Sequence, residues 1–487
     1  MPTRLDDLPG RAAPDRPALT FGDRTVTYAE LAAEVRAAGA RLRDLGLRRG
    51  ERVAVYLEKR IETVVALFAV SAAGGVVVPV NPVATPPQVR HILADCAAAL
   101  VVTSAPRLRA LGPDLPARVV PIDELCPSAV RPADDTAPVV AESDVAAIFY
   151  TSGSTGGPKG VMVSHRNLLT GARSVAGYLG HTVDDVVLSV LPLSFDAGFS
   201  QLTTGFLAGA HVVLINYLTP GEVVRACVRH GVTALTCVPP LWRQLAARPW
   251  PATRLRYWAS TGGPMPAATL ARLREIFPAA APYLMYGLTE AFRSTYLDPA
   301  EIDRRPGSIG KAIPDAEVVV VRPDGSQCAP GEPGELVHRG PLVALGYWND
   351  PERTAARFRP FPPGTGEIAA WSGDLVRRDE DGFLYFVGRT DEMIKTSGYR
   401  VSPTEIEDAA YATGLVGEAV AFGVADEDLG QRIVLAVSGC RSEPLVTALR
   451  RGLPGYLVPR QVLELAELPR SANGKFDRVE LRRMVSA

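Results

Sequence analysis

The chain contains 487 residues, with 52 lysines and arginines against 53 aspartates and glutamates, and a formal net charge of −1. Hydrophobic residues make up 47% of the chain and charged residues 22%, a balance that excludes an intrinsically disordered protein. The near-zero charge argues against a general nucleic-acid binder, which would show a basic excess. At roughly 100–200 residues per domain, the length predicts about three folding units.

The cysteines and histidines show no metal or disulfide pattern. The six cysteines form no CxxC pair, and the six histidines show no ligand spacing such as HxxxH. A zinc site or a disulfide framework would need closer groupings, so we expect isolated thiols and ordinary histidines.

Neither the N-terminus nor the apolar segments predict attachment to a membrane. Residues 1–17 are polar and Pro-rich, with no apolar signal core. The most apolar stretch, residues 64–80, is interrupted by Gly74, Gly75 and Pro79. It is typical of a buried helix followed by a buried strand, and we expect a cytoplasmic protein.

The first part of the chain alternates helices and strands. Apolar residues at helical spacing predict helices over residues 28–45, 61–73 and 88–96. Strand-like runs occur at residues 52–57, 76–80, 99–103 and, after a Pro-rich acidic loop at 127–144, at 145–150. This alternation predicts a parallel sheet covered on both faces, and therefore an α/β fold.

The pattern changes in the second part of the chain. Residues 317–337 contain short strands around turns, which predict a smaller, more antiparallel β unit. After Gly388 come a charged segment, a helix at 403–411, strands at 418–424 and 431–438, and a final helical region. We therefore expect an N-terminal domain over 1–388 and an α+β C-terminal domain over 392–487, a normal domain size of roughly 100 residues.

A segment rich in glycine and hydroxyl residues follows the strand at 145–150. It reads Thr151-Ser152-Gly153-Ser154-Thr155-Gly156-Gly157-Pro158-Lys159-Gly160. The glycines allow close backbone approach to an anion, the hydroxyls donate hydrogen bonds, and the lysine supplies positive charge. The segment is not a Walker A loop and matches neither GxGxxG nor GxSxG. Its composition alone also fits a flexible surface loop.

The amino-acid sequence of this segment closely resembles the signature of the adenylate-forming superfamily. That superfamily includes acyl-CoA synthetases, nonribosomal peptide adenylation domains and firefly luciferase. Further motifs of that family follow in order: LPLSFD at 191–196, YGLTE at 286–290, GEL at 334–336, WSGDL at 371–375, GRTD at 388–391 and NGK at 473–475. The resemblance extends from Thr25 to Lys475. The wording of residues 286–296 and 391–407 is most similar to stand-alone bacterial acyl-CoA ligase-like enzymes.

The resemblance implies an ATP-dependent ligase. It would join a carboxylic or amino acid to the α-phosphate of ATP, release pyrophosphate, and transfer the acyl group to a phosphopantetheine thiol. Coenzyme A or a separate carrier protein would supply that thiol. The implied catalytic residues are Lys475, Thr151, Glu290 and Lys395, and Glu290 with Thr151 would place Mg²⁺. The implied nucleotide-binding residues are Thr151, Ser152, Gly153, Ser154, Thr155, Gly156, Lys159, Gly262, Gly263, Pro264, Tyr286, Gly287, Thr289, Asp374, Arg389 and Lys475.

Within this set, Asp374 resembles the carboxylate that binds the ribose hydroxyls, and Tyr286 the ring that stacks on adenine. Two positions depart from the family pattern: Ser372 stands where Thr is commoner, and Pro264 replaces an acidic residue. Without the resemblance, Asp374 would be read as a turn residue and Gly262-Gly263 as a tight turn.

The C-terminal motifs imply a mobile domain. Lys475 would bridge the carboxylate and the α-phosphate, although Asn-Gly-Lys alone would indicate an exposed turn. Residues 389–391, and Asp391 above all, would form the hinge between two half-reactions. After rotation, Lys395, Gly398 and Arg400 would face the adenylate and shape the thiol channel; otherwise they form a charged exposed hairpin.

The identity of the acid stays open. Phe195, Asp196, Ser200, Met285 and Arg293 occupy positions expected to line the acid pocket. A lone buried carboxylate is costly, so Asp196 could bind a substrate ammonium, pair with a protein cation such as Arg293, or stay solvated. It could also simply cap a local turn.

The expected partners are the small-molecule acid and, for some acceptors, a separate acyl carrier protein. No nucleic acid or membrane is expected, and the protein would be a monomer or homodimer. A non-thiol acceptor such as an amine, or an unusual acid, is the alternative within this enzyme class. A silent nucleotide-binding regulator is a remote alternative, because the residues that matter for phosphate chemistry are retained.

Overall fold

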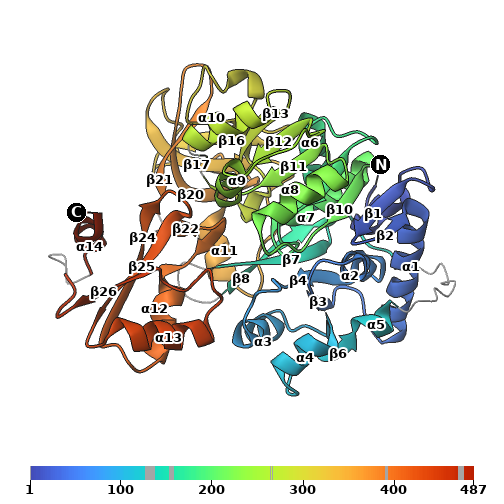
Figure 1. The fold of residues 1–487 in the computed structure, drawn as a ribbon, viewed down its shortest axis with the longest axis horizontal. Helices are drawn as coiled ribbons and strands as arrows, with labels where there is room; N and C mark the ends of the chain where they lie inside the picture. The colour runs from blue at the N-terminus through green and yellow to red at the C-terminus, as the bar shows by residue number, and fades with distance from the viewer. Residues whose placement is uncertain are drawn as a thin grey trace.

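The computed structural model describes residues 2–126, 138–152, 158–263, 265, 267–389, 393–469 and 476–486. Within these ranges the strands form three sheets, two before residue 390 and one after it. Figure 1 shows the elements after residue 393 as a separate lobe beside the larger body. The fold is therefore α/β, with a large N-terminal domain and a small C-terminal domain, as predicted.

The first sheet has seven strands in the order β18-β8-β7-β4-β3-β5-β6. Strands β4, β3, β5 and β6 are parallel, and β4 also pairs parallel with β7, while β7, β8 and β18 pair antiparallel. The strands are β3 (Arg52–Tyr56), β4 (Val76–Pro79), β5 (Leu100–Thr103), β6 (Arg118–Pro121), β7 (Val145–Ser152), β8 (Pro158–Ser164) and β18 (Gly346–Tyr347). The helices between them are α2 (Ile61–Ala72), α3 (Pro86–Asp95), α4 (Ala105–Leu111) and α5 (Ile122–Leu125).

The second sheet has 14 strands and contains the predicted small β unit as its continuation. Strands β9 to β13 are parallel, whereas the strands from β14 to β21 pair antiparallel. The strands are β1 (Pro17–Phe21), β2 (Arg24–Thr27), β9 (Val186–Ser189), β10 (His211–Leu214), β11 (Ala234–Cys237), β12 (Tyr257–Ser260), β13 (Ala281–Tyr286), β14 (Thr295–Leu297), β15 (Ser308–Ala312), β16 (Glu317–Val321), β17 (Pro333–Arg339), β19 (Phe358–Pro360), β20 (Ile368–Arg378) and β21 (Leu384–Arg389).

Helices cover this second sheet and join it to the first. They are α1 (Tyr28–Asp44), α6 (His165–Tyr178), α7 (Asp196–Ala208), α8 (Pro220–Arg229), α9 (Pro239–Ala246), α10 (Ala267–Ile276) and α11 (Pro351–Arg357), with short 3₁₀ turns η1 (Leu5–Gly10), η2 (Thr289–Ala291) and η3 (Pro299–Glu301). Phe68 of α2, Phe149 of β7, and Phe199 and Phe206 of α7 are fully buried against one another. This aromatic contact holds the two sheets in one hydrophobic core.

The third sheet belongs to the C-terminal domain. Its strands are β22 (Ile394–Thr396), β23 (Tyr399–Val401), β24 (Glu418–Asp426), β25 (Gly430–Ser438) and β26 (Gln461–Leu465), and its helices are α12 (Pro403–Ala412), α13 (Ser442–Gly452) and α14 (Arg478–Ser486). Two apolar clusters of its own stabilise it. The predicted hinge centre, Asp391, lies outside the described residues, so the boundary at 389–391 stays a prediction.

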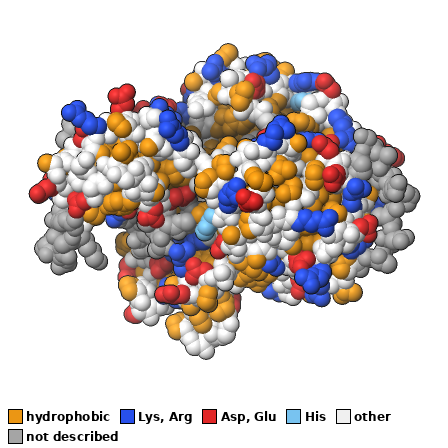
Figure 2. Space-filling model, turned by 90° about the horizontal axis from the view of Figure 1, so that it is seen from below, with side chains coloured by type: hydrophobic (Ala, Val, Ile, Leu, Met, Phe, Trp, Pro, Cys, Tyr) orange, Lys and Arg blue, Asp and Glu red, His pale blue; other side chains and the backbone are white. Residues whose placement is uncertain are grey.

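The surface charge is mixed (Figure 2), as the near-zero net charge predicts, and the cysteines are unpaired, as their spacing predicts. Figure 2 shows acidic and basic side chains interspersed over one face, with no large area of a single sign. All six cysteines are free thiols. Among the helices in the described ranges, none combines the length and apolar character that a membrane crossing requires.

Candidate active site

The predicted phosphate lysine and the predicted metal-binding glutamate meet in one buried cluster. Lys159 lies at the start of β8 and Glu290 in the 3₁₀ turn that follows β13. The Lys159 Nζ donates a hydrogen bond to Glu290 Oε1 at 3.0 Å, and the Tyr347 hydroxyl donates to the same oxygen at 2.6 Å. The Lys159 side chain is 14% exposed and that of Glu290 only 2%. The two motifs therefore form one charged centre.

Opposite charge keeps this centre ionised. Burial alone would raise the pKa of the Glu290 carboxyl, but the nearby cations Lys159, Arg400 and Arg357 hold that pKa well below its usual range. Burial lowers the pKa of the Lys159 amine, and the charge of Glu290 opposes that effect. Tyr347 also packs against the lysine, with Nζ 4.3 Å from its ring centre.

Sequence reasoning did not find Tyr347. It comes from β18, a strand of two residues that pairs with β8 opposite Val161. So short a strand has no periodicity, and no signal in the residues around it indicates a contact with Glu290. The pairing with β8 brings the tyrosine to the charged centre.

The phosphate segment is described only at its two ends. Thr151 lies next to the last residue of β7, and among the described residues its buried Oγ1 has no hydrogen-bond partner. The predicted residues Gly153, Ser154, Thr155 and Gly156 lie outside the described residues, as does the side chain of Ser152. Thr151 and Lys159 face each other across the β7–β8 pairing, which brings the two described ends of the predicted loop together.

The predicted ribose and adenine residues also meet. The Tyr286 hydroxyl, at the end of β13, donates a hydrogen bond to Asp374 Oδ2 of β20 at 2.5 Å. Asp374 is 3% exposed. Gly262 and Gly263 follow β12, the strand next to β13, so adjacent strand ends supply these groups. Pro264 lies outside the described residues, and the side chain of Arg389 is not described.

Two of the three predicted thiol-channel residues lie against the N-terminal domain. Gly398 has a φ of +81°, and a Cβ there would lie 2.7 Å from Val238 Cγ1, so glycine suits both the backbone and the space. Its neighbour Tyr399 packs edge-on against Phe195, with ring centres 5.1 Å apart. Arg400 adds positive charge beside Lys159 and Glu290. The turn between β22 and β23 thus reaches the charged centre.

Lys395 lies farther along the same hairpin. Its Nζ is 4.7 Å from the ring centre of Phe386 in β21, and its backbone N–H donates to Gln431 Oε1 at 2.8 Å. Lys475, the predicted catalytic lysine, lies outside the described residues. The structure therefore places the β22–β23 hairpin beside the predicted active site. It does not describe the position of Lys475.

Asp196 is the first residue of α7, beside the predicted acid pocket. Its Oδ1 accepts a hydrogen bond from the Ala197 backbone at 2.6 Å. Burial raises the pKa of this carboxyl, and the positive charge of Arg293 opposes the rise. The two side chains form no ion pair within 4.0 Å, both being among the described residues. The local contact is thus observed, and direct pairing with Arg293 is not.

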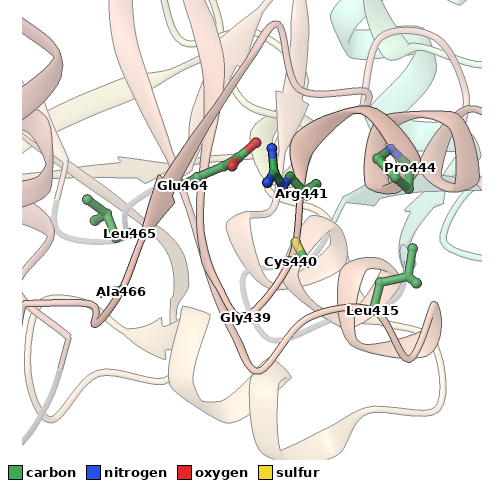
Figure 3. Close-up of a pocket in the computed structure, with 8 residues that line it drawn as sticks. All are labelled: Leu415, Gly439, Cys440, Arg441, Pro444, Glu464, Leu465 and Ala466. Atoms are coloured by element: carbon green, nitrogen blue, oxygen red, sulfur yellow. The ribbon is translucent and has the colours of Figure 1, made fainter.

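A small cavity of about 20 Å³ adjoins these residues. Ser200, Met285 and Arg293, all predicted pocket residues, line it together with His181 and Tyr257, which the sequence did not indicate. A larger hollow of about 640 Å³ opens in the C-terminal domain between Cys440, Arg441 and Glu464 (Figure 3). None of the residues that line this larger hollow belongs to the predicted site, and we assign it no role.

The metal prediction fits the oxygen donors present. Mg²⁺ is usually held by one or two carboxylates, with substrate phosphates and water completing its ligands. Glu290 supplies a carboxylate and Thr151 a buried hydroxyl without a partner among the described residues. Within the described ranges no group of three acidic, histidine or cysteine side chains forms a stronger metal site. The site therefore suits a cation that arrives with a phosphate.

A large α/β domain with nucleotide motifs at its strand ends, followed by a small α+β domain, defines an adenylate-forming ligase. The model of the AMP-binding enzyme family matches residues 9–348, and that of the AMP-binding enzyme C-terminal domain matches residues 405–475. The chain belongs to the AMP-binding enzyme family.

Two curated relatives match almost the whole chain. A long-chain-fatty-acid–CoA ligase from Salmonella typhimurium is 33% identical, over 96% of this chain and 91% of the relative. A feruloyl-CoA synthase from Amycolatopsis is also 33% identical, over 97% of this chain and 96% of the relative. Their names differ in the acid, so similarity of sequence leaves the acid undecided.

Solved structures of similar proteins share the fold over both domains. The o-succinylbenzoate CoA synthetase MenE from Bacillus subtilis, bound with its product analogue OSB-NCoA, has a TM-score of 0.88 and 28% identity, over 99% of this chain and 98% of that one. MenE in complex with the acyl-adenylate intermediate OSB-AMP has a TM-score of 0.73 and 28% identity, over 98% of each chain. The amide bond synthetase McbA from Marinactinospora thermotolerans has a TM-score of 0.86 and 26% identity, over 99% of each chain.

Proposed function

We propose that this ligase activates a small carboxylic acid as its acyl-adenylate and then transfers the acyl group to the thiol of coenzyme A or of a separate carrier protein. The buried Lys159–Glu290 pair carries this proposal, because it combines a phosphate-binding cation with a metal-binding carboxylate. Asp374 and Tyr286 would bind the ribose and the adenine. The other residues of the phosphate segment would bind the phosphates of ATP, as the resemblance implies.

In the first half-reaction the chain must bring two anions together. Lys159 would neutralise the phosphates, and Glu290 with Thr151 would hold Mg²⁺, which supplies further charge neutralisation when bound. Arg400 adds a cation to the same centre. Lys475 is proposed to bridge the carboxylate and the α-phosphate.

The second half-reaction needs a different domain orientation in this proposal. The contacts of Gly398 and Tyr399 with the N-terminal domain support the view that the described orientation is that of acyl transfer. The higher similarity to MenE with its CoA product analogue than to MenE with its acyl-adenylate also supports it. Residues 389–391 would be the hinge, with 1–388 and 392–487 as the two domains.

An amine acceptor is the second candidate for the transfer step. The similarity to an amide bond synthetase over 99% of both chains favours it. An ammonium on the acid itself is a separate possibility, because the half-buried Asp196 carboxylate would gain a counter-ion from it. The six free thiols support a cytoplasmic location, where disulfides are rare.

The test is acid-dependent exchange of pyrophosphate into ATP across a broad acid panel, followed by acceptor assays. Exchange that requires Mg²⁺ and is abolished in Asp374→Ala would support adenylation. Product formation with coenzyme A, a carrier protein or an amine then identifies the acceptor. ATP binding without exchange for any acid would contradict the proposal.

A further inference from the structure

Arg293 is a buried cation without a paired anion. Its residue is 4% exposed, and its Nη1 donates to Thr261 Oγ1 at 2.5 Å. Its buried Nε has no hydrogen-bond partner among the described residues, and no carboxylate among them lies within ion-pair distance. An unpaired guanidinium inside a protein is unfavourable unless an anion completes it. The N–H donor left over is therefore a candidate contact for a ligand.

The local backbone positions this cation between the nucleotide motifs and the small cavity. A Cβ at Gly287 would lie 2.9 Å from Arg293 Cα and 3.3 Å from its Cδ, so glycine lets the arginine side chain lie close against the YGLTE segment. The guanidinium reaches Thr261, next to the predicted adenine-binding glycines, and also lines the cavity. An acid bound in the cavity would thus meet the arginine close to the reaction centre.

The cavity is too small for a fatty chain. It measures about 20 Å³, whereas a single water needs roughly 10–15 Å³. The polar residues that line it include Ser200, Gln201, Thr204 and Tyr257. Behind Met285, the Tyr178 hydroxyl lies 2.8 Å from its Sδ, and the Tyr178 ring stacks on Tyr296. Only a compact group fits.

His181 and Tyr257, which also line the cavity, form an uncharged hydrogen-bonding pair. His181 Nε2 lies 2.8 Å from the Tyr257 hydroxyl, and the buried Nδ1 has no partner among the described residues. Burial lowers the pKa of His181 to about 4, so this histidine is neutral at physiological pH. Arg293 is accordingly the charged group that can select a ligand by its charge.

Building on the function proposed above, we propose that Arg293 selects acids that have a second carboxylate on a short chain. The substrates are then short dicarboxylic acids, with or without an amine, rather than long-chain fatty acids. One carboxylate is adenylated, and the second accepts a hydrogen bond from Arg293 Nε. The second carboxylate of such a substrate supplies the counter-ion that the guanidinium lacks. A monocarboxylic acid of the same length has a methyl group in that place and leaves the guanidinium unpaired.

Four acids of equal length test this inference on the unmodified enzyme. Butyrate has neither extra group, 2-aminobutyrate adds an amine, succinate adds a carboxylate, and aspartate adds both. We expect kcat/KM for pyrophosphate exchange to be roughly 10- to 100-fold higher for the two dicarboxylic acids than for their matched monocarboxylic acids, as a charge-assisted hydrogen bond provides. An effect of the amine would report on Asp196 independently.

Arg293→Met should remove the preference for the second carboxylate, so that the kcat/KM ratio of succinate to butyrate falls from roughly 10- to 100-fold to about one. Arg225→Met is the matched control, because Arg225 is on the exposed side of α8 with a side chain 72% exposed, and it should keep the preference. The comparison of acids on the wild type stands even if Arg293→Met does not fold.

Three outcomes would overturn the inference. Butyrate or decanoate used at least as well as succinate would remove the selection for a second carboxylate while leaving adenylation intact. An equal loss with all four acids in Arg293→Met would place the arginine on the reacting carboxylate instead. Exchange with no acid of any length would contradict adenylation itself, and the inference with it.

Discussion

At the scale of single residues, one oxygen of Glu290 accepts hydrogen bonds from both Lys159 and Tyr347. Because both charged side chains are buried, each is the partner that makes the burial of the other tolerable. In our proposal the same pair binds phosphate and metal. Stability and catalysis would then depend on the same two side chains, and a variant can separate the two contributions.

Glu290→Gln keeps the size of the side chain and removes its charge. We expect ATP–pyrophosphate exchange to fall by about 100-fold or more, because a charged group of the phosphate site is lost. We also expect a loss of roughly 3 kcal/mol in stability, since Lys159 is left buried without its anion. Initial rates of exchange and denaturant unfolding measure the two effects.

Lys159→Met and the double variant complete a mutant cycle for this pair. The double variant should be less destabilised than the sum of the single variants, because no charge is then left unpaired. The pKa of Glu290 is lowered in the folded state, so its stabilising effect is present at neutral pH and is lost as the solution becomes acidic through the carboxylate range. Additive losses would show that the two groups do not stabilise each other.

A second buried lysine titrates in a different range. The Lys59 Nζ donates to the backbone carbonyl of Ser189 at 2.7 Å, and burial lowers the pKa of this amine from 10.5 to about 7. Between these two values the unfolded chain binds more protons than the folded one, so this group makes stability rise with pH. Below about pH 7 the cost of protonating the buried amine is present in full.

Lys59→Met removes that titration. The stability of the variant relative to the wild type should therefore fall by about 3 kcal/mol between pH 7.5 and 9.5, at about 1.4 kcal/mol per pH unit. Denaturant midpoints at the two pH values measure the change, and Lys311→Met, at an exposed lysine, is the control. Parallel pH curves for wild type and Lys59→Met would mean that Lys59 titrates normally.

At the scale of elements, helices α3 and α12 join the two domains through their first turns. Gln88 belongs to the capping box of α3, where its Oε1 accepts from the Thr85 backbone N–H at 3.0 Å. The Gln88 side-chain oxygen therefore caps α3, while its amide Nε2 donates a hydrogen bond to Glu405 Oε1 of α12 at 3.0 Å. Burial raises the pKa of the Glu405 carboxyl, and the Gln88 amide opposes the rise.

Gln88→Glu should weaken this domain contact and leave α3 capped, because glutamate also serves in a capping box. Two carboxylates would then face each other, at a cost of about 1–2 kcal/mol, or roughly 5- to 30-fold in the population of this orientation. We expect slower acyl transfer from a supplied acyl-adenylate, while pyrophosphate exchange is retained.

The exchanged pair Gln88→Glu with Glu405→Gln restores one donor and one acceptor, and should recover the transfer rate. Acidic pH should also partly relieve the single variant, since protonation of either carboxyl removes the repulsion. Equal rates in the single variant, the double variant and the wild type would show that this contact does not hold the domains together.

At the scale of the whole molecule, the described orientation presents β22 and β23 to the nucleotide motifs, and two half-reactions require a second orientation in our proposal. Lys475→Ala tests this directly. We expect the variant to lose acyl-adenylate formation and largely to retain acyl transfer from a supplied adenylate. The two half-reactions are measured separately, and an equal loss in both would contradict the two-orientation proposal.

Much of this architecture could be predicted from the sequence, for a physical reason. The segments 61–73 and 76–80 are almost entirely apolar, and the structure buries α2 and β4 on all sides. Local burial of this kind leaves a local pattern. The motif residues could be placed through the resemblance, because each family motif follows the end of a particular strand.

Contacts between distant segments could not be predicted in the same way. Tyr347 reaches Glu290 through a two-residue strand, and Gln88 meets Glu405 across 317 positions of sequence. The size of the small cavity depends on how Tyr257 and Met285 pack, which neither periodicity nor motif spacing encodes. The same limit explains why the acid itself could not be named.

The free thiols have a consequence for chemical selectivity. Burial raises the pKa of all six cysteine thiols, to about 11 for Cys96 and further for the most enclosed ones. At neutral pH they remain protonated, and a thiol is a far weaker nucleophile than a thiolate. An enzyme that produces an activated acyl group is therefore poorly able to acylate its own cysteines.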